Sequence, residues 1–306
     1  MYKKTSVQEK VSAVSSLSLL GQKVEDFKLL VKFRLTLTVV FTSMMAFILA
    51  SPGAIEWGWM LVLALGGFLV TGAANALNQV LEKDYDRLMT RTENRPIAAG
   101  RMSVSQAVLW AGFMSLGGIV FLAMFNVWAA FFGMLALVSY AFIYTPLKRV
   151  SPIAIPVGAF PGALPMLIGA VAVQGELTTF AIILFTIQFF WQFPHFWAIG
   201  WLGFDDYQKA GFKLVPENEG QRDQKTGWYA FIYATLLIFV PFMFLWNGEV
   251  SLVAIFVLAF IGAIYALYGY RLYQVKTRKA ALQLMFSSFF YLPLVLAVMM
   301  IDKFLF

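Results

Sequence analysis

The stretch that decides the fold covers residues 58–96, and it reads GWMLVLALGGFLVTGAANALNQV followed by LEKDYDRLMTRTENRP. The first part is an apolar run that is long enough for a membrane-spanning helix, which needs about 20 residues. The second part is dense in charge and begins where the apolar run ends. The sequence therefore predicts a membrane helix whose end carries a polar site.

Apolar segments of this kind recur along the whole chain of 306 residues, of which 60% are hydrophobic and 13% charged. They should all be helices, because lipid offers no partner for unpaired backbone groups. The composition thus predicts an all-α polytopic membrane protein, with about nine transmembrane helices in a bundle around a central cavity. The expected spans are 33–51, 58–80, 103–124, 127–145, 153–173, 178–202, 228–246, 250–272 and 281–301.

The basic residues lie almost entirely on one side of these spans. Of the 23 Lys and Arg residues, 22 fall in the N-terminal tail or near the loops on its side, and Lys303 is the exception. The positive-inside rule then predicts a cytoplasmic N-terminus and an external C-terminus. The net charge of +7 is explained by this topology, so nucleic acid is not expected as a partner.

Two domains are expected, a polar cytoplasmic tail over 1–28 and a single transmembrane domain over 29–306. The tail lacks the short apolar core and small-residue cleavage site of a signal peptide. The chain has no cysteine, which excludes disulfides, thiolate metal sites and cysteine catalysis.

Three oxygen-bearing side chains follow one another at helical spacing at the end of the second span. Asn78, Glu82 and Asp86 are i, i+4 and i+8, so they stack on one helical face over about 12 Å. Carboxylates in a row suit Mg²⁺, and Arg91 and Arg95 on the following turns suit phosphate. Surface ion pairs at a solvated helix end are the alternative. Asn78 argues against it, because a polar group inside an apolar run is costly, and the pattern favours a metal–diphosphate site.

A second basic cluster, Lys148 and Arg149, stands at a helix end beside a tight turn. These side chains either anchor the helix at the cytoplasmic surface or contact the same diphosphate. Both interpretations remain open.

A third cluster surrounds His195, the only histidine of the chain, which lies inside a span next to Pro194. Ionisable residues in the membrane are candidates for function, although a neutral histidine bonded to a neighbouring helix is the alternative. Asp205 and Asp206 come ten and eleven residues later, about 15–17 Å along the axis if the helix continues. They would then lie near the cytoplasmic surface.

Together these motifs resemble the UbiA superfamily of intramembrane prenyltransferases, and within it the branch that farnesylates heme. The superfamily's first motif is an Asn followed by acids at four-residue intervals, as at 78, 82 and 86. The branch is marked by Met-x-Arg-Thr-x-x-Arg-Pro at 89–96, and by Tyr-Thr-Pro-Leu-Lys-Arg at 144–149. Its further marks are Trp-Gln-x-Pro-His-Phe at 191–196 and Asp-Tyr-x-x-Ala-Gly at 206–211.

Two departures from the superfamily pattern concern the site. The second aspartate motif usually spaces two acids three residues apart, whereas this chain has only the adjacent pair at 205 and 206. Near the first span the family often shows Lys-Pro-Arg, and this chain has Lys32-Phe33-Arg34. The first departure leaves the ligands of a second metal undetermined. The second affects the local backbone geometry but keeps both cations.

The resemblance implies transfer of the farnesyl group of farnesyl diphosphate to a vinyl group of heme B, which gives heme O. It implies Mg²⁺ as cofactor, the bacterial inner (plasma) membrane as location, and heme A synthase or a terminal oxidase as partner. Glu82, Asp86 and Asp206 would hold the metal, with Asn78 as a further oxygen ligand. His195 would ligate heme iron or act near the vinyl group. The residues implied for the diphosphate are Lys32, Arg91, Arg95, Lys148 and Arg149.

Three other functions are compatible with parts of the sequence. A related prenyltransferase that acts on a quinone precursor or a chlorin would have the same metal site. A transporter would also have broken spans and an intramembrane histidine. A transporter would not need acids and arginines clustered at one cytoplasmic face, however. A purely structural membrane subunit predicts that Glu82→Gln and Arg95→Ala have no effect.

Overall fold

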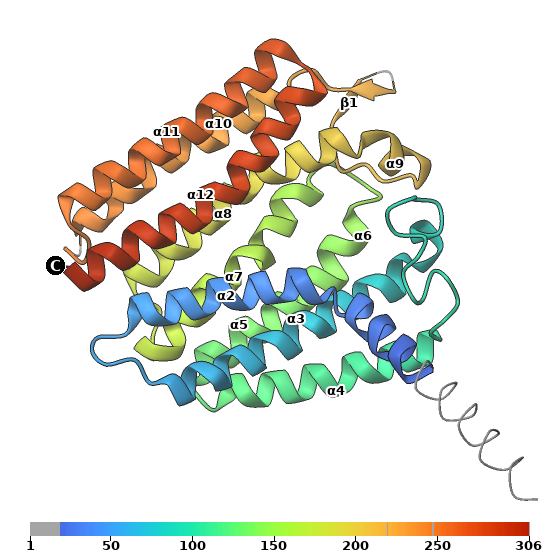
Figure 1. The fold of residues 1–306 in the computed structure, drawn as a ribbon, viewed down its shortest axis with the longest axis horizontal. Helices are drawn as coiled ribbons and strands as arrows, with labels where there is room; N and C mark the ends of the chain where they lie inside the picture. Colours follow the sequence, from blue (N-terminus) through green and yellow to red (C-terminus); the bar gives the residue numbers. More distant parts are fainter. Residues whose placement is uncertain (1–18, 219, 247, 306) are drawn as a thin grey trace, which may run out of the picture.

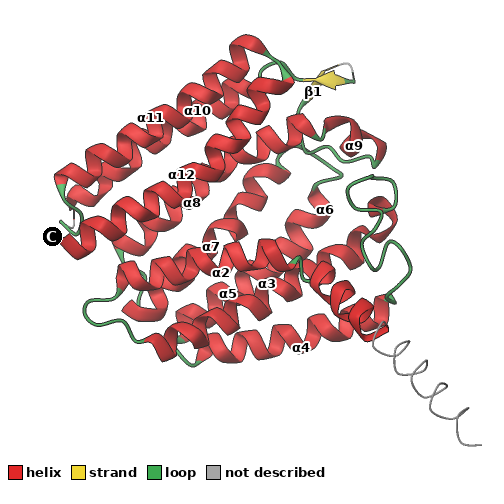
Figure 2. Cartoon of the chain, viewed as in Figure 1, coloured by secondary structure: helices red, strands yellow, loops and turns green. Residues whose placement is uncertain are grey.

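The computed structural model describes residues 19–218, 220–246 and 248–305 (Figures 1 and 2). Within these ranges, nine helical segments are long and apolar enough to cross a membrane, which confirms the predicted spans. They are Phe33–Ala50 (α2), Trp57–Asp86 (α3), Val104–Ala123 (α4), Val127–Leu147 (α5, η1 and α6), Ala154–Gln174 (α7), Thr179–Leu202 (α8), Thr226–Trp246 (α10 and η2), Leu252–Val275 (α11) and Arg278–Leu305 (α12).

Two of the spans change helix type along their length. In the fourth, α5 (Val127–Val138) passes through a π-helix, η1 (Ser139–Tyr144), before α6 (Thr145–Leu147). In the seventh, α10 (Thr226–Phe239) tightens into the 3₁₀ helix η2 (Val240–Trp246). Between α8 and α10 lie two smaller elements, the helix α9 (Phe204–Lys209) and an antiparallel hairpin of β1 (Glu217–Asn218) and β2 (Gln221–Arg222).

The spans form two groups of helices that meet along α7 and α8 (Figure 1). In one group α2 packs on α7, and α3 packs on α4; in the other α10 packs on α11, and α12 packs on α8. The proline-rich α7 is continuous, and its glycines permit close approach to its neighbours. A Cβ at Gly169 would lie 2.0 Å from the carbonyl oxygen of Ser43 on α2. The glycines of α7 therefore allow this span to pack closely against α2.

Side chains at the short turns fix where helices begin. Ser103 forms a capping box with Gln106 at the start of α4, and Asn126 accepts a hydrogen bond from the first turn of α5. Ser251 caps α11 and also binds the carboxylate of Asp302 on α12. Such caps satisfy N–H groups that a helix cannot pair internally.

The segment before α2 is part of the fold rather than a loose tail. Residues 19–30 are helical, and Asp26 forms an ion pair with Arg101 at 2.8 Å. The amide of Gln79 on α3 donates to the carbonyl oxygens of Leu29 and Leu30, at 2.8 and 2.9 Å. Residues 19–28 of the expected tail are therefore packed helix, residues 1–18 lie outside the described part, and the division into a tail and a transmembrane domain stays a prediction.

Candidate functional site

The polar face of α3 continues beyond the apolar run, because the helix ends only at Asp86. Asn78, Glu82 and Asp86 lie on this face as the spacing predicts, and all three are buried, with Asp86 0% exposed. Asp84 lies off the face, exposed, and forms an ion pair with Arg87. Two buried carboxylates are unfavourable unless positive groups compensate them.

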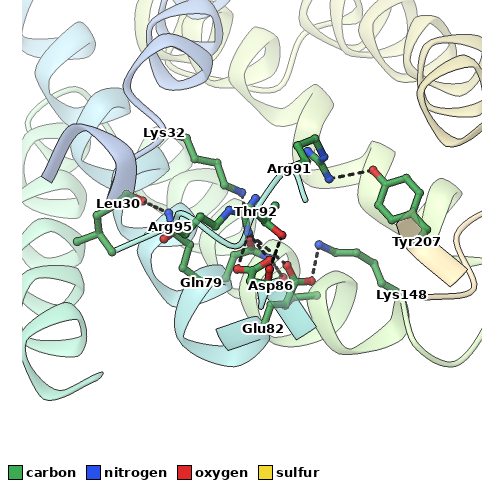
Figure 3. Close-up of polar contacts among 12 residues, drawn as sticks. Leu30, Lys32, Gln79, Glu82, Asp86, Arg91, Thr92, Arg95, Lys148 and Tyr207 are labelled. Atoms are coloured by element: carbon green, nitrogen blue, oxygen red, sulfur yellow. Dashed lines mark hydrogen bonds and ion pairs between the residues drawn. The ribbon is translucent and has the colours of Figure 1, made fainter. Parts of the chain in front are cut away.

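Cations from two other segments compensate these carboxylates (Figure 3). One guanidinium nitrogen of Arg95, in the loop after α3, lies 2.8 and 2.7 Å from the two carboxylate oxygens of Asp86. The same nitrogen is 3.9 Å from Glu82. The ammonium group of Lys148, which follows α6, lies 2.6 Å from the other oxygen of Glu82. Both acids are therefore held in ion pairs.

A third cation, Lys32, reaches the same face from the turn before α2. Its Nζ donates to Oδ1 of Asn78 at 2.9 Å, and Nδ2 of Asn78 donates to the hydroxyl of Thr145 at 3.1 Å. Burial, together with the positive charges of Arg95 and Lys148, lowers the pKa of Lys32 well below its usual range. An anion placed among these three cations would oppose that shift, because it favours the charged form of the lysine.

Residues of α9, more than 100 positions further along the chain, hold the loop that follows α3. The backbone N–H groups of Thr90 and Arg91 donate to the carboxylate of Asp206, at 3.4 and 3.5 Å. The guanidinium of Arg91 donates to the hydroxyl of Tyr207 at 3.2 Å (Figure 3). Asp206 thereby holds the backbone of the loop that carries Arg91.

Asp205 and Asp206 belong neither to the helix of His195 nor to a three-acid group with the acids of α3. The helix that carries His195 does not continue to the acids, because α8 ends at Leu202 and Gly203 separates it from α9. Among the described residues, no group of three or more His, Asp or Glu side chains could hold a metal ion. The structure thus brings Glu82 and Asp86 together but does not bring Asp206 to them.

A cavity of about 310 Å³ opens onto these side chains. Eight of the ten residues that the sequence nominates line it, namely Lys32, Asn78, Glu82, Asp86, Arg91, Arg95, Lys148 and His195. Asp206 and Arg149 are not among the described lining residues. Arg149 instead donates to the hydroxyl of Tyr85 at 2.7 Å and lies over its ring. The described wall carries four cations and two acids, so its formal charge of +2 favours an anionic ligand.

Four aromatic residues complete the wall: Tyr144 and Tyr207 belong to the motifs quoted above, whereas Tyr140 and Phe212 were not indicated by the sequence. Tyr140 and Tyr144 lie in the π-helical segment η1, and Tyr207 and Phe212 come from the region of α9. The ammonium of Lys148 lies 4.7 Å from the ring centroid of Tyr144. A π-helix within a span often marks a functional site, and this signal is not visible in the sequence.

A second, apolar cavity of about 110 Å³ adjoins the first one, with Leu35 and Tyr140 in both walls. It lies among α2, α3, the fourth span and α7, and Val40, Val70 and Ala74 are among its lining residues. The two cavities together offer a cationic chamber next to an apolar slot. This arrangement suits a molecule with an anionic head and a hydrocarbon tail.

The UbiA prenyltransferase family model matches residues 39–292 of the chain. A protein named protoheme IX farnesyltransferase from Flavobacterium johnsoniae is 43% identical over 286 residues, which cover 92% of this chain and 95% of the relative. The protein of the same name from Flavobacterium psychrophilum is 40% identical over 304 residues, which cover 96% of this chain and 100% of the relative.

Solved structures of low sequence identity share the fold. One is of digeranylgeranylglyceryl phosphate synthase, with a TM-score of 0.76 and 15% identity, and it covers 92% of this chain and 99% of that chain. Another is of a UbiA homolog from Archaeoglobus fulgidus bound to GPP and Mg²⁺, with a TM-score of 0.61 and 16% identity over 90% of this chain and 99% of that chain. The chain is a multi-pass membrane protein and belongs to the UbiA prenyltransferase family.

Proposed function

We propose that this protein transfers the farnesyl group of farnesyl diphosphate to a vinyl group of heme B and so forms heme O. The observation that carries the proposal is the cationic chamber that adjoins an apolar slot. A prenyl diphosphate has the same two parts, an anionic head and a long hydrocarbon tail. The acceptor is proposed from the two relatives named protoheme IX farnesyltransferase, which are 43% and 40% identical to this chain over most of its length.

The donor groups of the chamber fit Mg²⁺ bound to a diphosphate. Glu82, Asp86 and Asn78 offer the oxygen atoms that this hard cation prefers. In the protein alone, Arg95 and Lys148 neutralise the two carboxylates. With a metal-bound diphosphate in the chamber, Arg95 and Lys148 would pair with phosphate oxygens, and Glu82 and Asp86 would hold the metal. Every buried charge then keeps a partner of opposite sign, as burial requires.

Asp206 is proposed to position a loop, rather than to bind the metal as the family motif implies. Its carboxylate accepts from the backbone of Thr90 and Arg91, so it holds the loop that aims Arg91 at the chamber. Arg149 donates to the hydroxyl of Tyr85 on α3, so it is proposed to hold α3 in place rather than to contact the diphosphate.

The chain's own residues explain how such a transfer would proceed. When the C1–O bond of farnesyl diphosphate breaks, negative charge grows on the leaving group, and Lys32, Arg91, Arg95 and Lys148 are already in place to stabilise it. Bound Mg²⁺ would add Lewis-acid stabilisation of the same oxygens. The rings of the chamber wall can stabilise the allylic cation.

Bond formation completes the proposed reaction. C1 of the farnesyl group bonds to the terminal carbon of the vinyl group, and the oxygen of a water molecule bonds to the other vinyl carbon and loses a proton. The buried position of the chamber limits access of further water to the cation.

The acceptor is tested by product analysis. Membranes that contain the protein receive farnesyl diphosphate and Mg²⁺ with either heme B or a quinone precursor, and mass spectrometry identifies the products. The proposal expects heme O from the first mixture and no prenylated ring from the second. A prenylated quinone precursor without heme O would support the alternative, a UbiA-type enzyme for another aromatic acceptor.

The membrane and the orientation of the protein are proposed from the distribution of its basic residues and from its bacterial relatives. A cytoplasmic N-terminus in a bacterial inner membrane would put the chamber, at the C-terminal end of the second span, on the cytoplasmic side. Heme A synthase or a terminal oxidase would receive the product, because heme O is too apolar to leave the membrane freely.

A further inference from the structure

The ring of His195 is held from several sides inside the bundle. Trp191, one turn earlier on α8, stacks on it with 5.0 Å between ring centroids and 17° between ring planes. Phe289 on α12 meets it edge-on at 5.3 Å. Its Nδ1 lies 2.7 Å from the hydroxyl oxygen of Ser288, also on α12. A ring that is packed and hydrogen-bonded in this way presents its two nitrogens in fixed directions.

The hydroxyl of Ser288 decides which nitrogen carries the hydrogen. This residue is fully buried, and its Oγ donates to the carbonyl oxygen of Met285 at 2.5 Å. A serine hydroxyl has one hydrogen, and a carbonyl can only accept. With its hydrogen directed at the Met285 carbonyl, the Ser288 hydroxyl is left to accept from His195, and this pairing assigns the ring hydrogen to Nδ1. The neutral ring then keeps its lone pair on Nε2.

Ser288 also fixes the ring that stacks on the histidine. Its carbonyl oxygen accepts from Nε1 of Trp191 at 2.8 Å, and the hydroxyl of Tyr265 donates to the carbonyl oxygen of Trp191 at 3.2 Å. One residue of α12 thus orients two adjacent side chains of α8. Packing between the two helices would not require a hydroxyl at this position.

The other nitrogen of His195 is available to a ligand. His195 lines the cationic chamber, and the described residues offer its Nε2 no hydrogen-bond partner. An imidazole nitrogen with a free lone pair is a common axial ligand of heme iron. Histidines that bind metals usually donate their other N–H to an acceptor, which is the part that Ser288 plays here.

We propose that Ser288 is a positioning residue that holds His195 as the Nδ1–H tautomer and presents Nε2 as an axial ligand to the iron of the heme acceptor. The iron–nitrogen bond would place the heme beside the chamber in which the farnesyl cation forms. The inference about the heme iron rests on the proposed function, whereas the tautomer depends on the protein alone.

The tautomer is tested first, by nitrogen NMR of protein labelled with ¹⁵N-histidine. His195 is the only histidine of the chain, so purification by a tag without histidine leaves one pair of ring signals. We expect one protonated nitrogen, assigned to Nδ1, and one unprotonated nitrogen. A hydrogen on Nε2, or averaging between the two tautomers, would overturn the proposal without any variant.

Two serine variants separate positioning from general packing. Ser288→Ala should abolish the preference for the Nδ1–H form. Ser287→Ala is the matched control, because the Ser287 hydroxyl makes the same kind of bond on the same helix, to the carbonyl oxygen of Leu284 at 2.8 Å. It should leave the ring signals unchanged. Unchanged signals in Ser288→Ala would contradict the positioning role.

The ligand role is tested by titration with heme B, followed by absorption spectroscopy. We expect the spectrum of a histidine-ligated heme from the natural protein and from Ser287→Ala. His195→Ala should lose this spectrum and regain it with added imidazole, and Ser288→Ala should bind heme about 10–100-fold more weakly.

The outcomes distinguish the inference from the proposed function. Heme binding with the same spectrum in His195→Ala would overturn the iron–histidine bond and leave farnesyl transfer to heme intact. Failure of the natural protein to bind heme B would contradict both.

Discussion

The ion pair between Arg95 and Asp86 allows the sharpest prediction, because stability and activity should respond to it in different ways. The side chain of Asp86 is 1% exposed and that of Arg95 is 16% exposed. Arg95→Met leaves a buried carboxylate without its partner, so the free energy of unfolding should fall by about 3–5 kcal/mol. Asp86→Asn in the same protein removes that charge. The double variant should therefore regain much of the loss, with a coupling energy of about 2–3 kcal/mol.

Activity should not recover in the double variant. Removing one preplaced group that stabilises the leaving charge lowers kcat about 100- to 1000-fold. The double variant lacks both a cation for the diphosphate and a carboxylate for the metal, so its rate should be no higher than that of either single variant.

The assay is a double-mutant cycle measured twice, by equilibrium unfolding in mixed micelles and by initial rates of prenyl transfer. Asp84→Asn is the control, since Asp84 pairs with Arg87 on the exposed side of the same helix turn, 3.5 Å away. Such surface pairs contribute about 0–1 kcal/mol. A coupling energy below about 0.5 kcal/mol, or a double variant as active as the natural protein, would refute the reasoning.

Three further predictions address packing, the apolar slot and topology. Gly169→Ala should lower the unfolding free energy by about 1–3 kcal/mol, because the added Cβ would overlap α2. Gly112→Ala is the control in the same unfolding experiment, and it should not destabilise the protein because the space around Gly112 is open. Ala74→Leu should lower kcat/KM for farnesyl diphosphate roughly 5- to 150-fold, with a smaller effect on geranyl diphosphate, as measured by competing substrates. In this cysteine-free chain, Glu176→Cys should react with an impermeant thiol reagent in intact cells and Lys213→Cys only after permeabilisation; the reverse pattern would contradict the predicted orientation.

The spans could be predicted from the sequence because lipid restricts a crossing segment to one kind of structure. The polar face of α3 could also be predicted, because a helix places residues four apart in the sequence on the same side. Both predictions use local information only. The extension of α3 to Asp86 follows from the same periodicity, which continues into the charged segment.

The contacts across the site could not be predicted, because they join residues far apart in the sequence. Nothing near Asp206 indicates that its carboxylate holds the backbone of Thr90, 116 positions away. The hydroxyl of Tyr85 likewise accepts a hydrogen bond from Arg149, which lies 64 positions away. Glycine often ends a helix, so Gly203 could have indicated the break between α8 and α9. The apolar residues on both sides of it instead suggest a continuous span.

The central claim is that the polar face of α3 binds the metal–diphosphate part of a prenyl donor for transfer to heme. The most direct measurement is the rate of heme O formation from heme B and farnesyl diphosphate by Glu82→Gln and by Asp84→Asn, at equal amounts of folded protein. Glu82 faces the chamber and Asp84 faces away from it. We predict a rate at least about 100-fold lower for Glu82→Gln and a nearly natural rate for Asp84→Asn. Equal rates in the two variants would contradict the claim.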